Sequence, residues 1–169
     1  TGKVVEEACY SSTVAGTSQT VCPNGLDEQI GPGAAAPCTL DSCYHGTHVA
    51  GIAAGHGGGQ SFSGVAKGAQ IMAVQVFSEV IDPTACGGVA PCMGGFSSDV
   101  IAALERVYAV SAQWNIAAVN MSLGTGTFSG HCDDEPYKPI IDNLRAIGVA
   151  TIVASGNTGY RSSISSPAC

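Results

Sequence analysis

The spacing of hydrophobic residues changes near residue 45. Residues 3–44 are rich in Ser, Thr, Gly, Pro and Cys and show little periodicity, which predicts one long surface loop. From residue 45 onward, apolar runs alternate with amphipathic stretches. Residues 70–77 form a near-continuous apolar run, which is typical of a strand buried on both faces. Residues 78–96 carry two cysteines and several glycines and predict a second loop.

Regular elements are therefore expected mainly after residue 45. The pattern predicts helices at about 46–56, from Ser97 or Ser98 onward and near 135–147, and strands at about 70–77, 116–122 and 149–154. A glycine-rich turn at 57–59 joins the first helix to the first strand. This alternation predicts an α/β fold with a three-layer α/β/α arrangement around a parallel sheet. We interpret residues 1–169 as one domain, with a Cys-containing surface loop region (1–44) followed by βα units (45–169).

Charge and hydropathy limit the partners. The chain has 13 Asp plus Glu against 6 Lys plus Arg, a net charge of −7, and six scattered cations do not form the positive patch that nucleic acids require. No apolar run approaches the ~18 residues needed to cross a bilayer. We expect a monomer that binds neither nucleic acid nor membrane.

Cysteine usage indicates an oxidising compartment. Eight cysteines are present, at positions 9, 22, 38, 43, 86, 92, 132 and 169. None forms a Cys-x-x-Cys pair, so a zinc site is poorly supported, and an even number of cysteines in Gly/Pro-rich loops favours disulfides and secretion. Cys38 with Cys43 and Cys86 with Cys92 are close enough in sequence to pair locally. The partner of Cys169 is expected to lie outside the chain.

Residues 44–55 form the most specific motif, Tyr-His-Gly-Thr-His-Val-Ala-Gly-Ile-Ala-Ala-Gly. Its three glycines each cost a helix roughly 1 kcal/mol against alanine, which predicts close backbone packing against another layer. Residues 45–51 are similar to the histidine motif of the subtilisin-like serine peptidases, the subtilases of peptidase family S8. The resemblance implies that His45 is the general base and that His48 is a buried packing residue. An imidazole suits the role because it titrates near neutral pH.

Further motifs of the same family follow in the family's order. The family's Gly-Val-Ala segment is similar to residues 64–69, and the helix after its substrate-edge strand is similar to residues 98–104. Its Asn-Met-Ser-Leu-Gly strand resembles residues 118–124, and its oxyanion segment resembles residues 153–157. The resemblance implies that Asn157 stabilises the oxyanion. It also implies a peptide substrate, bound by an edge strand at Gly94 and Gly95, by a facing edge at Ser122, Leu123 and Gly124, and by a specificity pocket at Ser155 and Gly156.

The family's catalytic triad follows the chain order Asp, His, Ser, and only the histidine has a counterpart here. Thr1-Gly2 resembles the end of the family's Asp-Thr-Gly motif, and residues 165–168 resemble a Ser-Pro-Ala segment that precedes the nucleophile motif. We therefore expect a subtilisin-like fragment, truncated at both ends and inactive alone. Ser18, in a Gly-Thr-Ser sequence, is not expected to be the nucleophile, and Asp27 and Asp41 are not expected to be the triad aspartate.

Other functions are less well supported. A catalytically incomplete relative that binds peptides without cleaving them is the main alternative. A nucleotide site at the glycine-rich residues 124–130 is disfavoured, because three acids at 133–135 follow where a helix N-terminus should begin. Those acids are interpreted as helix-terminal charges rather than calcium ligands. The expected chemistry needs no cofactor, and structural calcium stays open.

Overall fold

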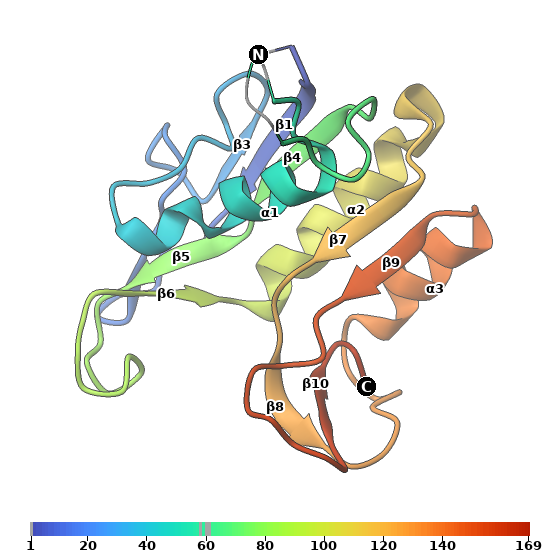
Figure 1. Ribbon diagram of the computed structural model, residues 1–169. Helices are drawn as coiled ribbons and strands as arrows, with labels where there is room; N and C mark the ends of the chain where they lie inside the picture. Colours follow the sequence, from blue (N-terminus) through green and yellow to red (C-terminus); the bar gives the residue numbers. More distant parts are fainter. Residues whose placement is uncertain (1, 58, 60–61) are drawn as a thin grey trace. The chain divides into compact units, whose positions relative to one another are not determined.

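The structure is a computed structural model that describes residues 2–57, 59 and 62–169 (Figure 1). Thr1 and Gly58, which the sequence analysis placed in a motif and in a turn, lie outside these ranges. The chain forms two compact units, Thr1–Ala103 and Leu104–Cys169.

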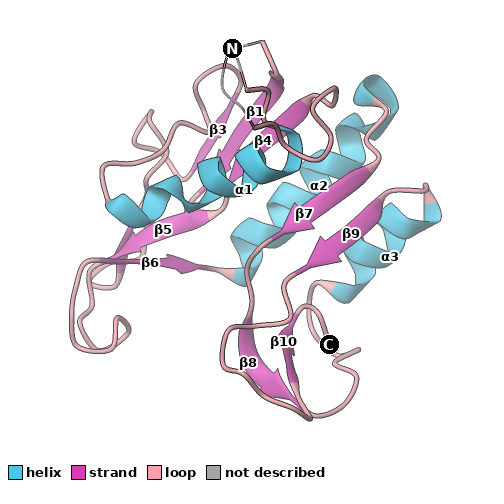
Figure 2. Ribbon diagram, in the orientation of Figure 1, coloured by secondary structure: helices cyan, strands magenta, loops and turns pink. Residues whose placement is uncertain are grey.

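The described part of the first unit contains short strands, a 3₁₀ helix, an α-helix and the beginning of a second α-helix (Figure 2). In chain order they are β1 (Val4–Tyr10), β2 (Ser18–Gln19), β3 (Glu28–Ile30), the 3₁₀ helix η1 (Asp41–Tyr44), α1 (His45–Ala54), β4 (Ile71–Gln75), β5 (Phe77–Val80) and β6 (Cys92–Gly95). Helix α2 (Ser97–Trp114) begins in the first unit and ends in the second. The predicted helix at 46–56 and strand at 70–77 are confirmed to within a few residues, as is the start of α2.

Strand β1 was not predicted. It is the middle strand of the order β3-β1-β4, antiparallel to β3 and parallel to β4, and its residues Ala8 and Cys9 are completely buried. The prediction of a surface loop at residues 3–44 is therefore wrong here. Two adjacent glutamates interrupt the apolar pattern of the strand in the sequence. In the structure, the Glu7 carboxylate accepts a hydrogen bond from the Gly33 backbone N–H at 2.7 Å, so its charge is satisfied.

A second sheet occupies the segment predicted as a loop at 78–96. Its strand order is β2-β5-β6, and both pairings are antiparallel, with β5 and β6 aligned from Phe77 opposite Gly95 to Val80 opposite Cys92. Glycine-rich β6 lacks the β-branched residues that mark a strand in sequence. The β3-β1-β4 sheet is mixed and the β2-β5-β6 sheet is antiparallel, so the expectation of a purely parallel sheet is wrong for the first unit.

The glycines of α1 do not pack as predicted. A Cβ placed on Gly46 or Gly51 would meet nothing within 4 Å among the described residues. Close packing occurs at the end of the helix, where the Gly64 backbone N–H donates to the Gly55 carbonyl at 2.7 Å. A Cβ on Gly64 would lie 2.5 Å from the Gly55 nitrogen and 2.7 Å from the Gly51 oxygen. The segment after the helix therefore needs glycine more than the helix does.

We predict that Gly64→Ala lowers the free energy of unfolding by about 1–3 kcal/mol, the usual cost of overpacking. The added methyl group has to push apart two backbone segments that hold each other by hydrogen bonds. Gly68→Ala is the matched control, because a Cβ there meets nothing within 4 Å among the described residues. Chemical denaturation of both variants measures the difference, and equal stability of the two would contradict the packing.

The second unit contains two pairs of strands and one helix of its own. Its elements are β7 (Ala118–Met121), β8 (Thr125–Phe128), α3 (Lys138–Ala146), β9 (Ala150–Val153) and β10 (Ile164–Ser166). The predicted strands at 116–122 and 149–154 and the helix near 135–147 are confirmed. β7 pairs in parallel with β9, β8 pairs antiparallel with β10, and α3 packs against β9 with Ile140 and Leu144 buried.

The exposed face of α3 carries charge pairs. The Lys138 ammonium donates a hydrogen bond to Asp142 at 2.5 Å and thereby holds the pKa of that carboxyl below its usual value. Arg145 lies 3.5 Å from the same carboxylate. These groups are solvated, so the pairs contribute little to stability.

All eight cysteines form disulfides, and none is free. The pairs are Cys9–Cys22, Cys38–Cys43, Cys86–Cys92 and Cys132–Cys169. Both predicted local pairs are confirmed. The expectation for Cys169 is wrong, because the segment that follows β10 meets the segment that follows β8, where the Ser166 hydroxyl also donates a hydrogen bond to Glu135 at 2.8 Å.

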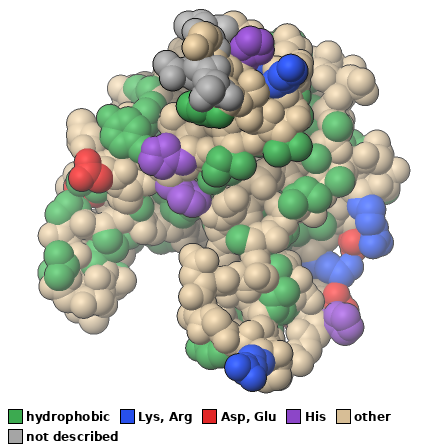
Figure 3. All heavy atoms as spheres, in the orientation of Figure 1, with side chains coloured by type: hydrophobic (Ala, Val, Ile, Leu, Met, Phe, Trp, Pro, Cys, Tyr) green, Lys and Arg blue, Asp and Glu red, His purple; other side chains and the backbone are tan. Residues whose placement is uncertain are grey.

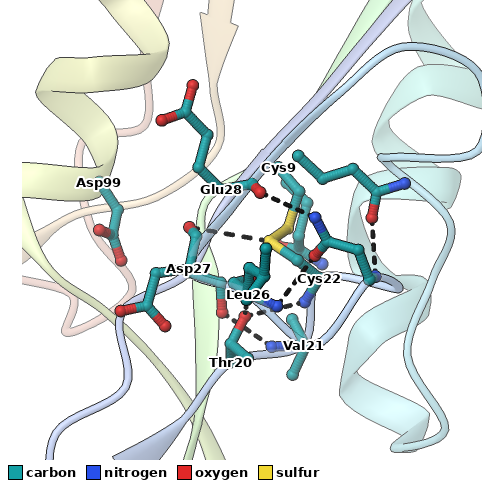
Figure 4. The surroundings of a disulfide bond; sticks show 12 residues. Cys9, Thr20, Val21, Cys22, Leu26, Asp27, Glu28 and Asp99 are labelled. Atoms are coloured by element: carbon teal, nitrogen blue, oxygen red, sulfur yellow. Dashed lines mark hydrogen bonds between the residues drawn. A yellow bond between two sulfur atoms is a disulfide. The ribbon is translucent and has the colours of Figure 1, made fainter.

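The Cys9–Cys22 disulfide ties central strand β1 to the loop before β3 (Figure 4). Around it, the Thr20 hydroxyl donates to the Leu26 carbonyl at 2.9 Å. Ser12 lies in the loop between β1 and β2, and its backbone N–H and hydroxyl donate hydrogen bonds to Asp99 of α2 at 2.9 and 2.7 Å. Covalent and polar links thus order a segment that buries few apolar groups.

Candidate active site

His45 is the first residue of α1 and directly follows η1. Its backbone N–H donates to the Ser42 carbonyl, so the 3₁₀ turn fixes where the helix begins. The Cys38–Cys43 disulfide constrains the same turn, two residues before the histidine. His45 and His48 are both exposed, and Figure 3 shows histidine side chains at the surface around α1. The expectation that His48 is buried is wrong, whereas the His45 imidazole is open to a reacting group.

Ser18, Asp27 and Asp41 are the residues within the chain that could be mistaken for the triad serine or aspartate. Their surroundings do not suit nucleophilic attack or partnership with a histidine. Ser18 is only 1% exposed, and its hydroxyl donates to the Ser12 carbonyl at 2.9 Å. The Asp27 carboxylate accepts a hydrogen bond from the Thr13 backbone N–H at 3.0 Å, and Asp41 is an exposed residue of η1. None of the three resembles an activated nucleophile or a buried partner of a histidine.

Gly94 and Gly95 lie on the outer strand of the β2-β5-β6 sheet. β6 pairs with β5 on one side, and among the described residues no strand pairs with its other side. A Cβ on Gly94 would approach Val80 Cγ2 to 2.7 Å, so β6 lies too close to β5 for a side chain there. β6 also contacts η1, which leads into His45. A free strand edge beside the candidate base is the geometry in which a peptide can be added as a further strand.

The remaining candidate residues belong to the second unit, in the segments 122–124 and 155–157 that follow strands β7 and β9. Met121 and Val153 are partners at the ends of these parallel strands, and the Ala154 backbone N–H donates to the Met121 carbonyl at 3.1 Å. Residues 122–124 and 155–157 therefore emerge side by side beyond the carboxyl ends of the strands, where sites of α/β sheets gather. Of these six residues, Ser122 and Leu123 are half-buried and the others, including Asn157, are exposed.

Ser165 holds the two segments together, and sequence reasoning missed it. Its backbone N–H donates to the Ser155 carbonyl at 3.1 Å, and its hydroxyl donates to the Gly126 carbonyl at 3.2 Å. A Cβ on Gly156, which has φ +107°, would collide with the Ser165 hydroxyl, and a Cβ on Gly124 would lie 3.3 Å from Ser165 Cβ. The signal was present in the Ser-Ser-Pro-Ala segment, but its contacts cannot be inferred from sequence.

The interpretation of the acids at 133–135 as helix-terminal charges is wrong, because α3 begins at Lys138 and has no acid in its first turn; two of the three acids have partners elsewhere in the second unit. Glu135 accepts a hydrogen bond from the Ser166 hydroxyl at 2.8 Å, and Asp133 lies 4.0 Å from the Lys138 ammonium. Across the described ranges, no group of three or more His, Cys, Asp or Glu side chains is arranged to hold a metal ion. Likewise, no helix within those ranges has the length and hydropathy of a membrane span.

Comparison with known proteins identifies the class. The profile of the subtilase family matches residues 27–169. The chain is 31% identical over 132 residues to alkaline protease 1 of Aspergillus clavatus, covering 76% of this chain and 27% of that protein. It is 31% identical over 123 residues to mycosin-3 of Mycobacterium tuberculosis (72% and 26%) and 33% identical over 123 residues to the extracellular basic protease of Dichelobacter nodosus (69% and 18%).

The chain belongs to the subtilase family of serine peptidases. This membership implies the subtilisin-like α/β fold, with which the parallel pairs β1–β4 and β7–β9 agree. The chain spans about a quarter of the length of the alkaline protease and mycosin relatives. Four disulfides and the extracellular name of one relative are consistent with secretion.

Proposed function

We propose that this chain is part of a secreted subtilisin-like serine endopeptidase that cleaves protein substrates with a Ser-His-Asp triad. The observation that carries the proposal is the exposed His45 at the first turn of α1, within the family's histidine motif. The aspartate and the serine come from parts of the protein outside residues 1–169. The whole domain has the three-layer α/β/α arrangement and acts as a monomer.

In the proposed mechanism, the His45 imidazole takes the proton of the serine hydroxyl as the oxygen attacks the scissile carbonyl. The same imidazole then protonates the leaving amine. The Asn157 side-chain amide donates a hydrogen bond to the oxyanion, where negative charge develops only in the transition state. These steps need no cofactor, because the triad and the amide supply both proton transfer and charge stabilisation.

The substrate backbone would pair with strand-edge backbone that each unit supplies. Gly94 and Gly95 offer the free edge of β6 in the first unit. In the second unit, residues 122–124 supply another edge, and Ser155 and Gly156 line the pocket for the side chain before the scissile bond. The position of Ser165 between Gly124 and Gly156 supports this assignment, because it gives the pocket segments a fixed spacing.

The test compares the full-length parent with residues 1–169 in a casein assay. We expect the parent to hydrolyse casein and the isolated chain to be inactive, because the chain lacks a nucleophile in the family's position. Hydrolysis by residues 1–169 that is abolished by His45→Ala would mean that the catalytic groups are misassigned. A parent that binds casein-derived peptides without cleaving them would instead support the alternative, a catalytically incomplete peptide-binding relative.

A further inference from the structure

Three sulfur atoms meet in the first unit, between the elements that carry the candidate base and the candidate substrate edge. The Met93 Sδ atom of β6 lies 3.7 Å from Cys43 Sγ and 4.0 Å from Cys38 Sγ. Both cysteines are in one disulfide, so the contact is a packing contact of polarizable sulfurs. Cys43 is only 8% exposed, whereas Cys38 and Met93 are half-buried, so the contact is partly shielded from solvent.

Each side of this sulfur contact leads directly to a functional segment. On one side, Cys43 belongs to η1, whose Ser42 carbonyl accepts the His45 backbone N–H. On the other side, Met93 precedes Gly94 on β6, and Gly94 is held against β5 by its close approach to Val80. A shift of η1 would move His45, and a shift of β6 would move Gly94 and Gly95. The sulfur contact therefore links the position of the histidine to that of the substrate edge.

We propose that Met93 is a positioning residue that sets the placement of the substrate edge relative to His45 by packing on the Cys38–Cys43 disulfide. The inference rests on the proposed peptidase function and adds a residue to it. The disulfide spans only five positions, so it acts mainly as a rigid surface beside the histidine. A misplacement of about 1 Å between reacting groups costs up to about 10²-fold in rate, so a contact of this kind affects catalysis without touching substrate.

The contact predicts a loss that depends on substrate length. A peptide long enough to pair with Gly94 and Gly95 senses the placement of β6, whereas a single-residue ester does not reach it. We expect Met93→Ala in the full-length parent to lower kcat/KM for the extended peptide about tenfold and to leave the ester within twofold. Met93→Leu, which restores the volume of the side chain, should recover most of the activity on the peptide.

Controls separate positioning from stability. Active-site titration with a fluorophosphonate normalises each rate to the folded enzyme. Met72→Ala removes another half-buried methionine, from β4, and should leave the ratio of peptide to ester activity unchanged. An equal loss on both substrates, or no loss on either, would overturn the positioning role.

A double-mutant cycle tests the sulfur contact itself, and its disulfide variant serves alone if Met93→Ala does not fold. Replacing both Cys38 and Cys43 with alanine should produce the same substrate-length dependence, and combining it with Met93→Ala should add no further loss. Additive effects would overturn the proposal. A wild-type parent that neither reacts with the fluorophosphonate nor cleaves either substrate would instead refute the proposed function, so the two failures are distinguishable.

Discussion

Replacing His45 with alanine in the full-length parent is expected to lower kcat by about 10⁶-fold. This is the size of the loss known for the triad histidine of subtilisin, another member of the family, and we adopt it on that basis. Without the imidazole, the serine hydroxyl keeps its proton and is a poor nucleophile. KM should change little, because the exposed imidazole is not part of either proposed substrate edge. Steady-state kinetics on a chromogenic peptide measure both constants.

His131→Ala is the matched control for the histidine variant. His131 is an exposed loop residue of the second unit, outside the proposed catalytic and binding segments, so its replacement should leave kcat within twofold. A His45→Ala variant that retains most of the wild-type kcat would show that another group is the base. The exposed neighbour His48 would then be the next residue to test.

Replacing Asn157 with alanine is expected to lower kcat by about 10²–10³-fold and to leave KM nearly unchanged. The magnitude is the one known for the oxyanion asparagine of subtilisin and is carried over by family membership. The physical reason is that the amide hydrogen bond strengthens only as charge develops on the scissile carbonyl oxygen. Asn143→Ala, at an exposed position of α3, is the control and should change neither constant. A higher KM with unchanged kcat for Asn157→Ala would contradict its role in stabilising the oxyanion.

The elements that sequence predicted well are those with a strong period or motif. Helix α1 lies within the histidine motif, and α2 has an apolar stripe in which Val100, Leu104 and Val107 are buried. Strands β1 and β6 were missed for opposite reasons. β1 carries two charges in its middle, one of which is satisfied by the Gly33 backbone N–H, and β6 is short and ends in two glycines.

The candidate site shows the same division. His45 and Asn157 could be proposed from sequence because each lies in a contiguous motif that resembles one of the family's. Ser165 and Met93 contact segments far away in the chain, and no local pattern encodes those contacts. The partner of Cys169 was mispredicted for this reason, since Cys132 lies 37 positions earlier in the chain.

Mapping the nucleophile tests whether His45 activates a serine located outside residues 1–169. The full-length parent and its His45→Ala variant are treated with a fluorophosphonate, digested and analysed by mass spectrometry. We expect one modified serine, preceded by Gly-Thr in the chain beyond Cys169, and no modification in the variant. Modification of a serine within residues 1–169, or equal modification of the His45→Ala variant, would contradict it.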